Sequence, residues 1–181
     1  MIQYGKTIYH KVYFMKKINT LFLPLILLIN FVHADDEKLY SFIGVQTSVT
    51  QFEKTTAPSI GLRYGVQSNK IRTSISYDYG KNGNSGYHTL LMQMDTGVLC
   101  NTFANSNLKP YMGASLGIMQ HNNKNSASPR NRGYLYGINA GLTYIVNDAI
   151  DLDLGYKFLK TKKLENIDSI NDLTFAMHYF Y

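Results

Sequence analysis

One acidic and one basic side chain, Asp153 and His178, form the pair in this sequence best suited to acid–base chemistry. An aspartate can orient an imidazole and stabilise its charged form. They lie in the last two segments of alternating sequence, and symmetric pairing of these segments about residues 161–170 would bring them close together. Hydrolysis through such a pair also needs a nucleophile, but His178 is followed by three aromatic residues rather than by a serine. We therefore expect no catalytic residue.

The other charged candidates all lie on the more polar face of their alternating segments. Symmetric pairing about residues 81–86 would place Arg72 opposite Asp95. Such charges are either the lining or gate of a polar pore, or an ion-paired plug that satisfies buried groups. His88 and His121 lack metal-ligand spacing, so we expect no metal and no cofactor, and we assign no binding residue. The charged candidates are Arg63, Arg72, Asp78, Asp95, Lys109, Asp151, Asp153, Lys157 and Asp172.

Strands must position these side chains, because apolar and polar residues alternate with a period of two. One face of each segment is bulky and apolar and has no charge within the strand body, whereas the other face holds the charges together with many Gly and Ser. A charge facing lipid costs about 2–4 kcal/mol at mid-membrane, so the bulky faces fit lipid and the small polar faces fit a crowded interior. The alternating segments are residues 39–49, 58–67, 70–80, 87–99, 108–120, 133–146, 149–160 and 173–181.

The alternation predicts an all-β protein, an eight-stranded antiparallel up-and-down transmembrane β-barrel. No apolar stretch after Ala34 approaches the roughly 20 residues of a membrane-spanning helix. Lipid offers no water to unpaired backbone groups, so strands that cross it must close on themselves. Eight strands enclose a lumen just wide enough for side chains to fill, which favours the plug over the pore.

The connections between the segments differ in length in the way expected of such a barrel. With the first strand starting in the periplasm, residues 68–69, 101–107 and 147–148 become periplasmic turns, and residues 51–57, 81–86, 120–132 and 161–170 become external loops. The longest loop is basic and rich in Asn and Ser. It is either a solvated loop or a site of weak attraction to anionic lipopolysaccharide or host glycans.

The first 34 residues have the layout of a leader with a secretory signal peptide. Lys16 and Lys17 precede an apolar stretch at residues 21–29, and Ala34 is the expected cleavage site. Met15 is the expected true start. The predicted domains are therefore residues 1–34, the leader, and residues 35–181, the barrel.

Removal of the leader changes what the net charge of +6 implies. Residues 1–34 contain four of the 18 basic residues and none of the 12 acidic ones, so the remaining chain has a net charge of +2. This removes the argument for nucleic-acid binding. The single Cys100 cannot form an internal disulfide.

Five motifs lie along the alternating segments: Phe42-Ile43-Gly44-Val45, KPYMGASLG at residues 109–117, AGLTY at 140–144, LDLGYKF at 152–158 and the aromatic end at 173–181. With these motifs the chain resembles the small eight-stranded outer-membrane barrels, namely the transmembrane domain of outer membrane protein A and the opacity-type proteins.

The resemblance implies a location in the bacterial outer membrane. The implied partners are outer-membrane lipid and lipopolysaccharide, and the barrel assembly machinery through the C-terminal strand. The implied role is that of a surface or structural protein. One such role is adhesion, or contact with a host or the environment, through the external loops, and the extracellular ligand is unknown. The alternatives are a narrow porin-like or hydrophobic-solute channel and an outer-membrane lipid-modifying enzyme. Lipid A deacylases of similar shape have a His and a Ser close together on a late strand, and this chain departs from that pattern.

Overall fold

The computed structural model describes residues 38–52, 55–83, 85–97, 106–123, 130–164 and 167–181. Residues 38–181 form a compact unit separate from residues 1–37. The predicted signal peptide, its cleavage site after Ala34 and the start at Met15 lie outside the described residues, and so does Cys100.

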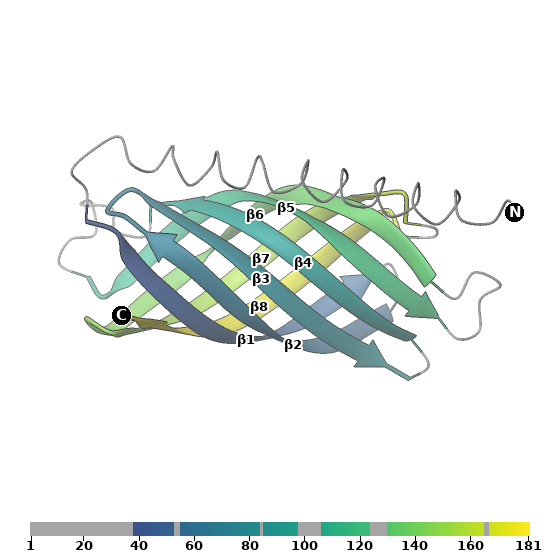
Figure 1. Cartoon of the computed structure of the whole chain (residues 1–181), viewed down its shortest axis with the longest axis horizontal. Coiled ribbons are helices and arrows are strands. Elements are labelled where there is room, and N and C mark those ends of the chain that lie inside the picture. Colours follow the sequence, from purple (N-terminus) through teal and green to yellow (C-terminus); the bar gives the residue numbers. More distant parts are fainter. Residues whose placement is uncertain (1–37, 53–54, 84, 98–105, 124–129, 165–166) are drawn as a thin grey trace, which may run out of the picture. The chain divides into compact units, whose positions relative to one another are not determined.

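Eight antiparallel strands form one closed barrel in chain order, which confirms the predicted fold (Figure 1). Each strand pairs with the next, and β1 closes the barrel against β8. At this closing ladder Phe42 faces Phe180, and the amide of Tyr181 donates to the carbonyl of Ser41 at 3.1 Å. The strands are β1 (Tyr40–Phe52), β2 (Thr55–Gln67), β3 (Ile71–Asn82), β4 (Ser85–Thr96), β5 (Leu108–Asn123), β6 (Arg130–Asn147), β7 (Ile150–Lys162) and β8 (Ser169–Phe180).

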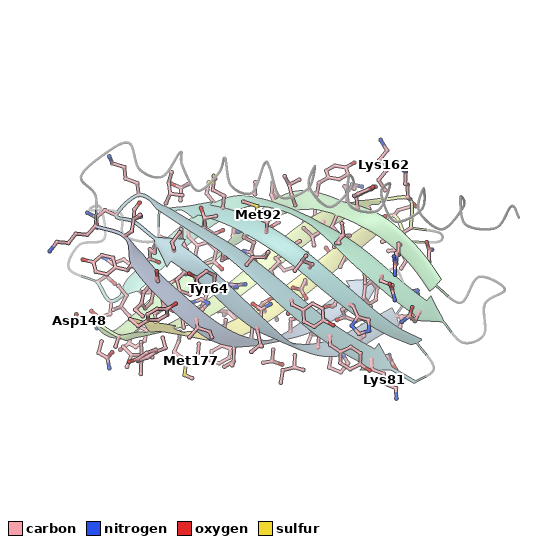
Figure 2. The ribbon with its side chains drawn as sticks, in the orientation of Figure 1. Tyr64, Lys81, Met92, Asp148, Lys162 and Met177 are labelled. Carbon is pink, nitrogen blue, oxygen red and sulfur yellow. The ribbon has the colours of Figure 1, made fainter. Side chains whose placement is uncertain are left out.

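The two faces of the strands are divided as the alternation predicts. Bulky apolar side chains cover the outside: Ile60 is 68% exposed and Ile138 is 67% exposed. Met177 points away from the barrel in Figure 2. All nine predicted interior charges are buried, and they share the lumen with Gly, Ser and Thr. In lipid the exposed apolar face is favourable, whereas in water it would be a patch far larger than a monomer usually shows.

The strands run farther than predicted at one end of the barrel. We call this the loop end; it carries the β1–β2, β3–β4, β5–β6 and β7–β8 hairpins, and the opposite end is the turn end. The prediction of a loop at residues 51–57 is wrong, because β1 extends to Phe52 and β2 begins at Thr55. β5 and β6 likewise extend into the predicted loop at residues 120–132, and β7 and β8 extend into the loop at 161–170.

The pattern of the two faces inverts at the loop end, which explains these boundaries. Outward positions there become polar, as at Gln51 and Gln120, while inward positions become apolar, as at Phe52 and Met119. The inward residues form what we call the apolar cap. Apolar-in and polar-out is the pattern of a barrel in water, so the inversion marks where the strands leave the lipid. The apolar cap comprises Phe52, Ala57, Tyr87, Leu91, Met119, Leu135, Leu159, Leu164, Ile167 and Ile170.

Glycines leave room inside the barrel for Tyr111, the largest aromatic side chain near the turn end. A Cβ atom added at Gly155 would lie 2.6 Å from the Tyr111 hydroxyl oxygen, and its next neighbour would be 3.5 Å away. Gly86, by contrast, has one neighbouring atom within 4 Å, at 3.7 Å. The absence of a side chain at Gly155 therefore keeps Tyr111 in its place.

Substitution of Gly155 by alanine should lower the free energy of unfolding by about 1–3 kcal/mol, because the lumen has no room for the added methyl group. Urea titration in lipid vesicles, followed by circular dichroism, measures the change. Tyr111→Phe removes the oxygen that the methyl group meets, so Gly155→Ala should have a smaller effect in that background. Gly86→Ala is the control and should be close to neutral. Equal effects at both glycines would contradict this packing.

Candidate functional site

Arg72 is the centre of an ion cluster that crosses the lumen. Its Nε donates to Asp95 Oδ2 at 3.2 Å, and Nη2 donates to Asp153 Oδ2 at 2.8 Å. All three residues are at most 1% exposed. Arg72 and Asp95 are opposite each other in the β3–β4 ladder, which confirms the predicted pair. Asp153 comes from β7, four strands away, so the cluster links opposite walls of the barrel.

Neutral side chains complete the hydrogen bonds of the two carboxylates. Tyr111 Oη donates to Asp153 Oδ1 at 2.8 Å, and Thr143 Oγ1 donates to Asp153 Oδ2 at 3.0 Å. Asn139 Nδ2 donates to Asp95 Oδ1 at 2.5 Å. All four carboxylate oxygens thus accept a hydrogen bond from the protein. A buried ionic network that is satisfied in this way rigidifies its surroundings, as a structural plug requires.

His178 pairs with Asp151, and the predicted proximity to Asp153 is wrong in register. His178 Nδ1 lies 2.6 Å from Asp151 Oδ1, and these residues are opposite in the β7–β8 ladder, whereas Asp153 faces Ala176. The prediction assumed a loop symmetric about its middle. Instead, β8 begins at Ser169 and Lys160 pairs with it, two residues before the partner that symmetry about residues 161–170 predicts, so the register is displaced by two.

The surroundings of His178 are closed. The residue is 0% exposed, its ring centroid lies 4.7 Å from that of Phe42, and its Nε2 lies 3.5 Å from Arg63 Nη1. Arg63 also donates to Gln93 Oε1 at 3.1 Å. General acid–base catalysis needs contact between the imidazole and the substrate, and this geometry gives the imidazole no open face. What it can do is join β8 to β7 inside the lumen through its contact with Asp151.

A second cluster lies closer to the loop end, around Lys157. Its Nζ donates to Asp172 Oδ2 at 2.6 Å and to Thr174 Oγ1 at 2.5 Å. Thr50 Oγ1 donates to Asp172 Oδ1 at 2.6 Å and itself accepts from Tyr87 Oη at 2.8 Å. These contacts join strands β1, β4, β7 and β8. The sequence predicted that the two charges face the lumen but did not predict their pairing.

The apolar cap lies in the lumen beyond this second cluster. Between the two lies a cavity of about 20 Å³, whose lining includes Asp78, Tyr87, Lys157 and Leu159. A cavity of this size holds on the order of one water molecule. Both ion clusters are buried in the lumen and pair charges of opposite sign, and this supports the interpretation of the interior charges as a plug.

The cap was missed by sequence reasoning, although a signal was present. Leu91, Leu135 and Leu159 each lie next to outward apolar residues on their strands, so the alternation is interrupted by short apolar runs. Such a run near the loop end of a strand marks the place where an inward position becomes apolar.

The two histidines that were considered as metal ligands, His88 and His121, have different neighbours. His88 Nδ1 lies 2.7 Å from the Tyr77 hydroxyl on the outer face, and the ring centroid of His121 lies 6.3 Å from that of Phe52. Within the described ranges, no group of three or more His, Cys, Asp or Glu could hold a metal ion. Among those residues no helix is long and apolar enough to cross a membrane.

The model of the outer membrane protein beta-barrel domain family matches residues 21–179. The chain belongs to this family. Members of it lie in the bacterial outer membrane, which confirms the predicted location. No curated protein matches the chain in sequence.

Solved structures of outer-membrane barrels share the fold of this family member. Neisserial surface protein A is 17% identical with a TM-score of 0.62, over 81% of this chain and 100% of that one. Outer membrane protein H of Pseudomonas aeruginosa is 20% identical with a TM-score of 0.57, over 78% and 99%. The N-terminal barrel of OprF from the same organism is 17% identical with a TM-score of 0.53, over 78% and 100%. At these identities the likeness concerns the fold alone.

Proposed function

We propose that the protein is a non-enzymatic surface protein of the outer membrane, in which a plugged barrel holds external hairpins that contact the surroundings. The observation that carries this is the length of β5 and β6, which have 16 and 18 residues. A transmembrane strand needs about 9–11 residues. Beyond Ile118, the last outward apolar residue of β5, the strand continues for five more residues, or roughly 16 Å. The loop end, on this proposal, faces outward from the cell.

The plugged lumen supports a surface role over transport. The ion clusters and the apolar cap leave little free volume, so the barrel acts as a rigid support. The C-terminal strand β8, with outward aromatic residues at Phe175 and Tyr179, is the segment we expect the barrel assembly machinery to bind. The outward apolar face contacts membrane lipid, and the partner of the external hairpins is an extracellular ligand.

An epitope inserted after Ser126, between β5 and β6, should be detected by antibody on intact cells. The matched insertion after Asp148 lies at the turn end, where Asp148 is exposed (Figure 2). This epitope should be detected only after the cells have been permeabilised. Both insertions leave the ladders intact, so both proteins should keep heat-modifiable gel mobility, which reports the closed barrel. Detection of the Asp148 epitope on intact cells would reverse the proposed orientation.

The hairpin contact itself can be tested by replacing residues 121–131 with Asn-Gly. The replacement keeps the Gln120–Arg132 pair and joins it by a favoured two-residue turn. Cells that carry the shortened protein should lose most of their binding to immobilised extracellular ligands relative to cells with the full hairpin. Unchanged binding, or a stable single-channel conductance of the purified barrel in planar bilayers, would contradict the proposed function.

A further inference from the structure

We propose that the outer face of β6 and β7 at the loop end binds the phosphate groups of lipopolysaccharide in the outer leaflet. We call this surface the basic face; it consists of Arg132, Tyr134, Tyr136, Lys160, Lys162 and Lys163. The inference rests on the proposed function, because the loop end must face the outer leaflet. It concerns the wall of the barrel and is separate from the hairpin tip.

The strand register brings the cations of the basic face together. Lys162 is opposite Tyr134, and Lys160 is opposite Tyr136 in the β6–β7 ladder. Lys160 and Lys162 are two residues apart and so point to the same side of β7; Arg132 lies one outward position beyond Tyr134 on β6. Directly opposed side chains have Cβ atoms about 5 Å apart, and diagonal neighbours lie about 7–8 Å apart. Figure 2 shows Lys162 pointing away from the barrel.

The cations of the basic face are not neutralised within the described part of the chain, where none of the four forms a salt bridge with a carboxylate. Arg132 Nε donates to the neutral Gln120 Oε1 at 2.7 Å. The Nζ atoms of Lys160 and Lys163 each lie 5.5 Å from an aromatic ring centroid, of Phe158 and of Tyr134. A cation over an aromatic face keeps its full charge, so the basic face retains its attraction for anions.

The basic face lies where lipid phosphates are expected. The next outward residues toward the turn end are apolar: Ile138 on β6 is 67% exposed and Phe158 on β7 is 36% exposed. Acyl chains would cover these residues, while Tyr134 and Tyr136 occupy the interface, as aromatic girdles do in outer-membrane barrels. The lysine stems can lie along this apolar surface and present their amines at the phosphate level.

Charge complementarity selects lipopolysaccharide as the occupant. Several phosphates close to the acyl chains of one lipid match several amines close to one another, which a lipid with a single phosphate cannot do. Asp168 is the exposed acid at the loop end among the described residues; its backbone carbonyl accepts from the Thr161 amide at 3.1 Å. Lys81, on β3, belongs to another side of the barrel, so the positive charge is concentrated on the basic face.

The test compares Lys160→Gln/Lys162→Gln with Lys38→Gln/Lys81→Gln, two double variants that remove the same charge. Binding of purified lipopolysaccharide to the folded full-length barrel in zwitterionic detergent is measured by titration. The attraction of one lysine beside an anionic lipid is worth roughly a fivefold change in affinity. The basic-face variant should therefore bind roughly 25-fold more weakly than wild type, and the control variant within about twofold. Heat-modifiable mobility verifies that each variant is folded.

The arms of the titration separate the possible results. Lipopolysaccharide whose phosphates have been removed should bind wild type and the basic-face variant equally weakly. Phosphatidylglycerol vesicles should bind wild type more weakly than lipopolysaccharide does. Equal affinities for the two double variants, or undiminished binding of the dephosphorylated lipid, would overturn the inference, as would tighter binding of phosphatidylglycerol. The epitope experiment reports orientation independently, so failure of the proposed function can be told from failure of this site.

Discussion

Arg72→Met should lower the free energy of unfolding by about 3–5 kcal/mol, because it leaves the buried Asp95 without its counter-ion. Asp153 would keep only the longer ion pair with Arg63, whose Nη1 lies 3.9 Å from Asp153 Oδ1. Asp95 and Asp153 are 0% and 1% exposed, and Arg72 is the cation that contacts both at hydrogen-bonding distance. The lumen offers these two carboxylates little water that could replace the hydrogen bonds lost with Arg72. The midpoint of urea unfolding in lipid vesicles, followed by gel mobility and circular dichroism, measures the loss.

Two further variants show whether the loss comes from uncompensated charge. The triple variant Arg72→Met/Asp95→Asn/Asp153→Asn removes both signs, and it should be more stable than Arg72→Met, since replacing a whole buried ionic group is often near neutral. Lys81→Met removes an exposed cation from the same strand and should change stability by less than about 0.5 kcal/mol. An Arg72→Met barrel as stable as Lys81→Met would mean that the cluster contributes little.

Ile138→Arg should cost up to about 2–4 kcal/mol, the midplane penalty, and reduce the fraction of protein that assembles, because an arginine within the apolar band of the outer face meets hydrocarbon. Ile138 is 67% exposed and lies in the middle of β6. The fraction of heat-modifiable protein recovered from outer-membrane preparations, boiled against unboiled, gives the result directly.

Gln120→Arg is the matched control for this prediction. Gln120 also faces outward but lies beyond the apolar band, beside the native Arg132. An arginine there should cost about 0–1 kcal/mol, because the penalty falls steeply toward the interface. Equal losses at both positions would mean that the outer wall of the barrel does not face lipid.

The sequence predicts the barrel and its two faces well because side-chain direction in a strand has a strict period of two. Once Arg63 and Asp153 are assigned to the polar face, their burial follows from the closure of the sheet. The pairing of Arg72 with Asp95 could be predicted because the β3–β4 hairpin is tight and its ladder runs from Asn82–Ser85 without a shift. The register of two strands joined by a short hairpin can thus be predicted from the sequence.

The strand ends and the apolar cap at the loop end depend on where the lipid ends. The alternation of apolar and polar residues alone does not predict that position. Gln51 and Ala57 were assigned to a loop because the outward residues turn polar there, yet the backbone remains in the ladder. Inward Leu135 and Met119 could not be separated from their outward apolar neighbours by periodicity. The pairing of His178 failed for a third reason, since β8 begins at Ser169, within the stretch that had been assigned to the loop.

The ladder between β1 and β8 gives the barrel an unusual folding problem. Each other ladder joins strands that follow one another in the chain and can form as a local hairpin, whereas this one must bring Phe42 to Phe180. The entropy of closing so long a loop is lost before the contact stabilises anything, and until then both open edges can pair with other chains. Assembly speed therefore depends on one long-range encounter. After closure the same ladder has to break before the cylinder can open, so the lifetime of the folded state is set by a barrier as much as by an equilibrium.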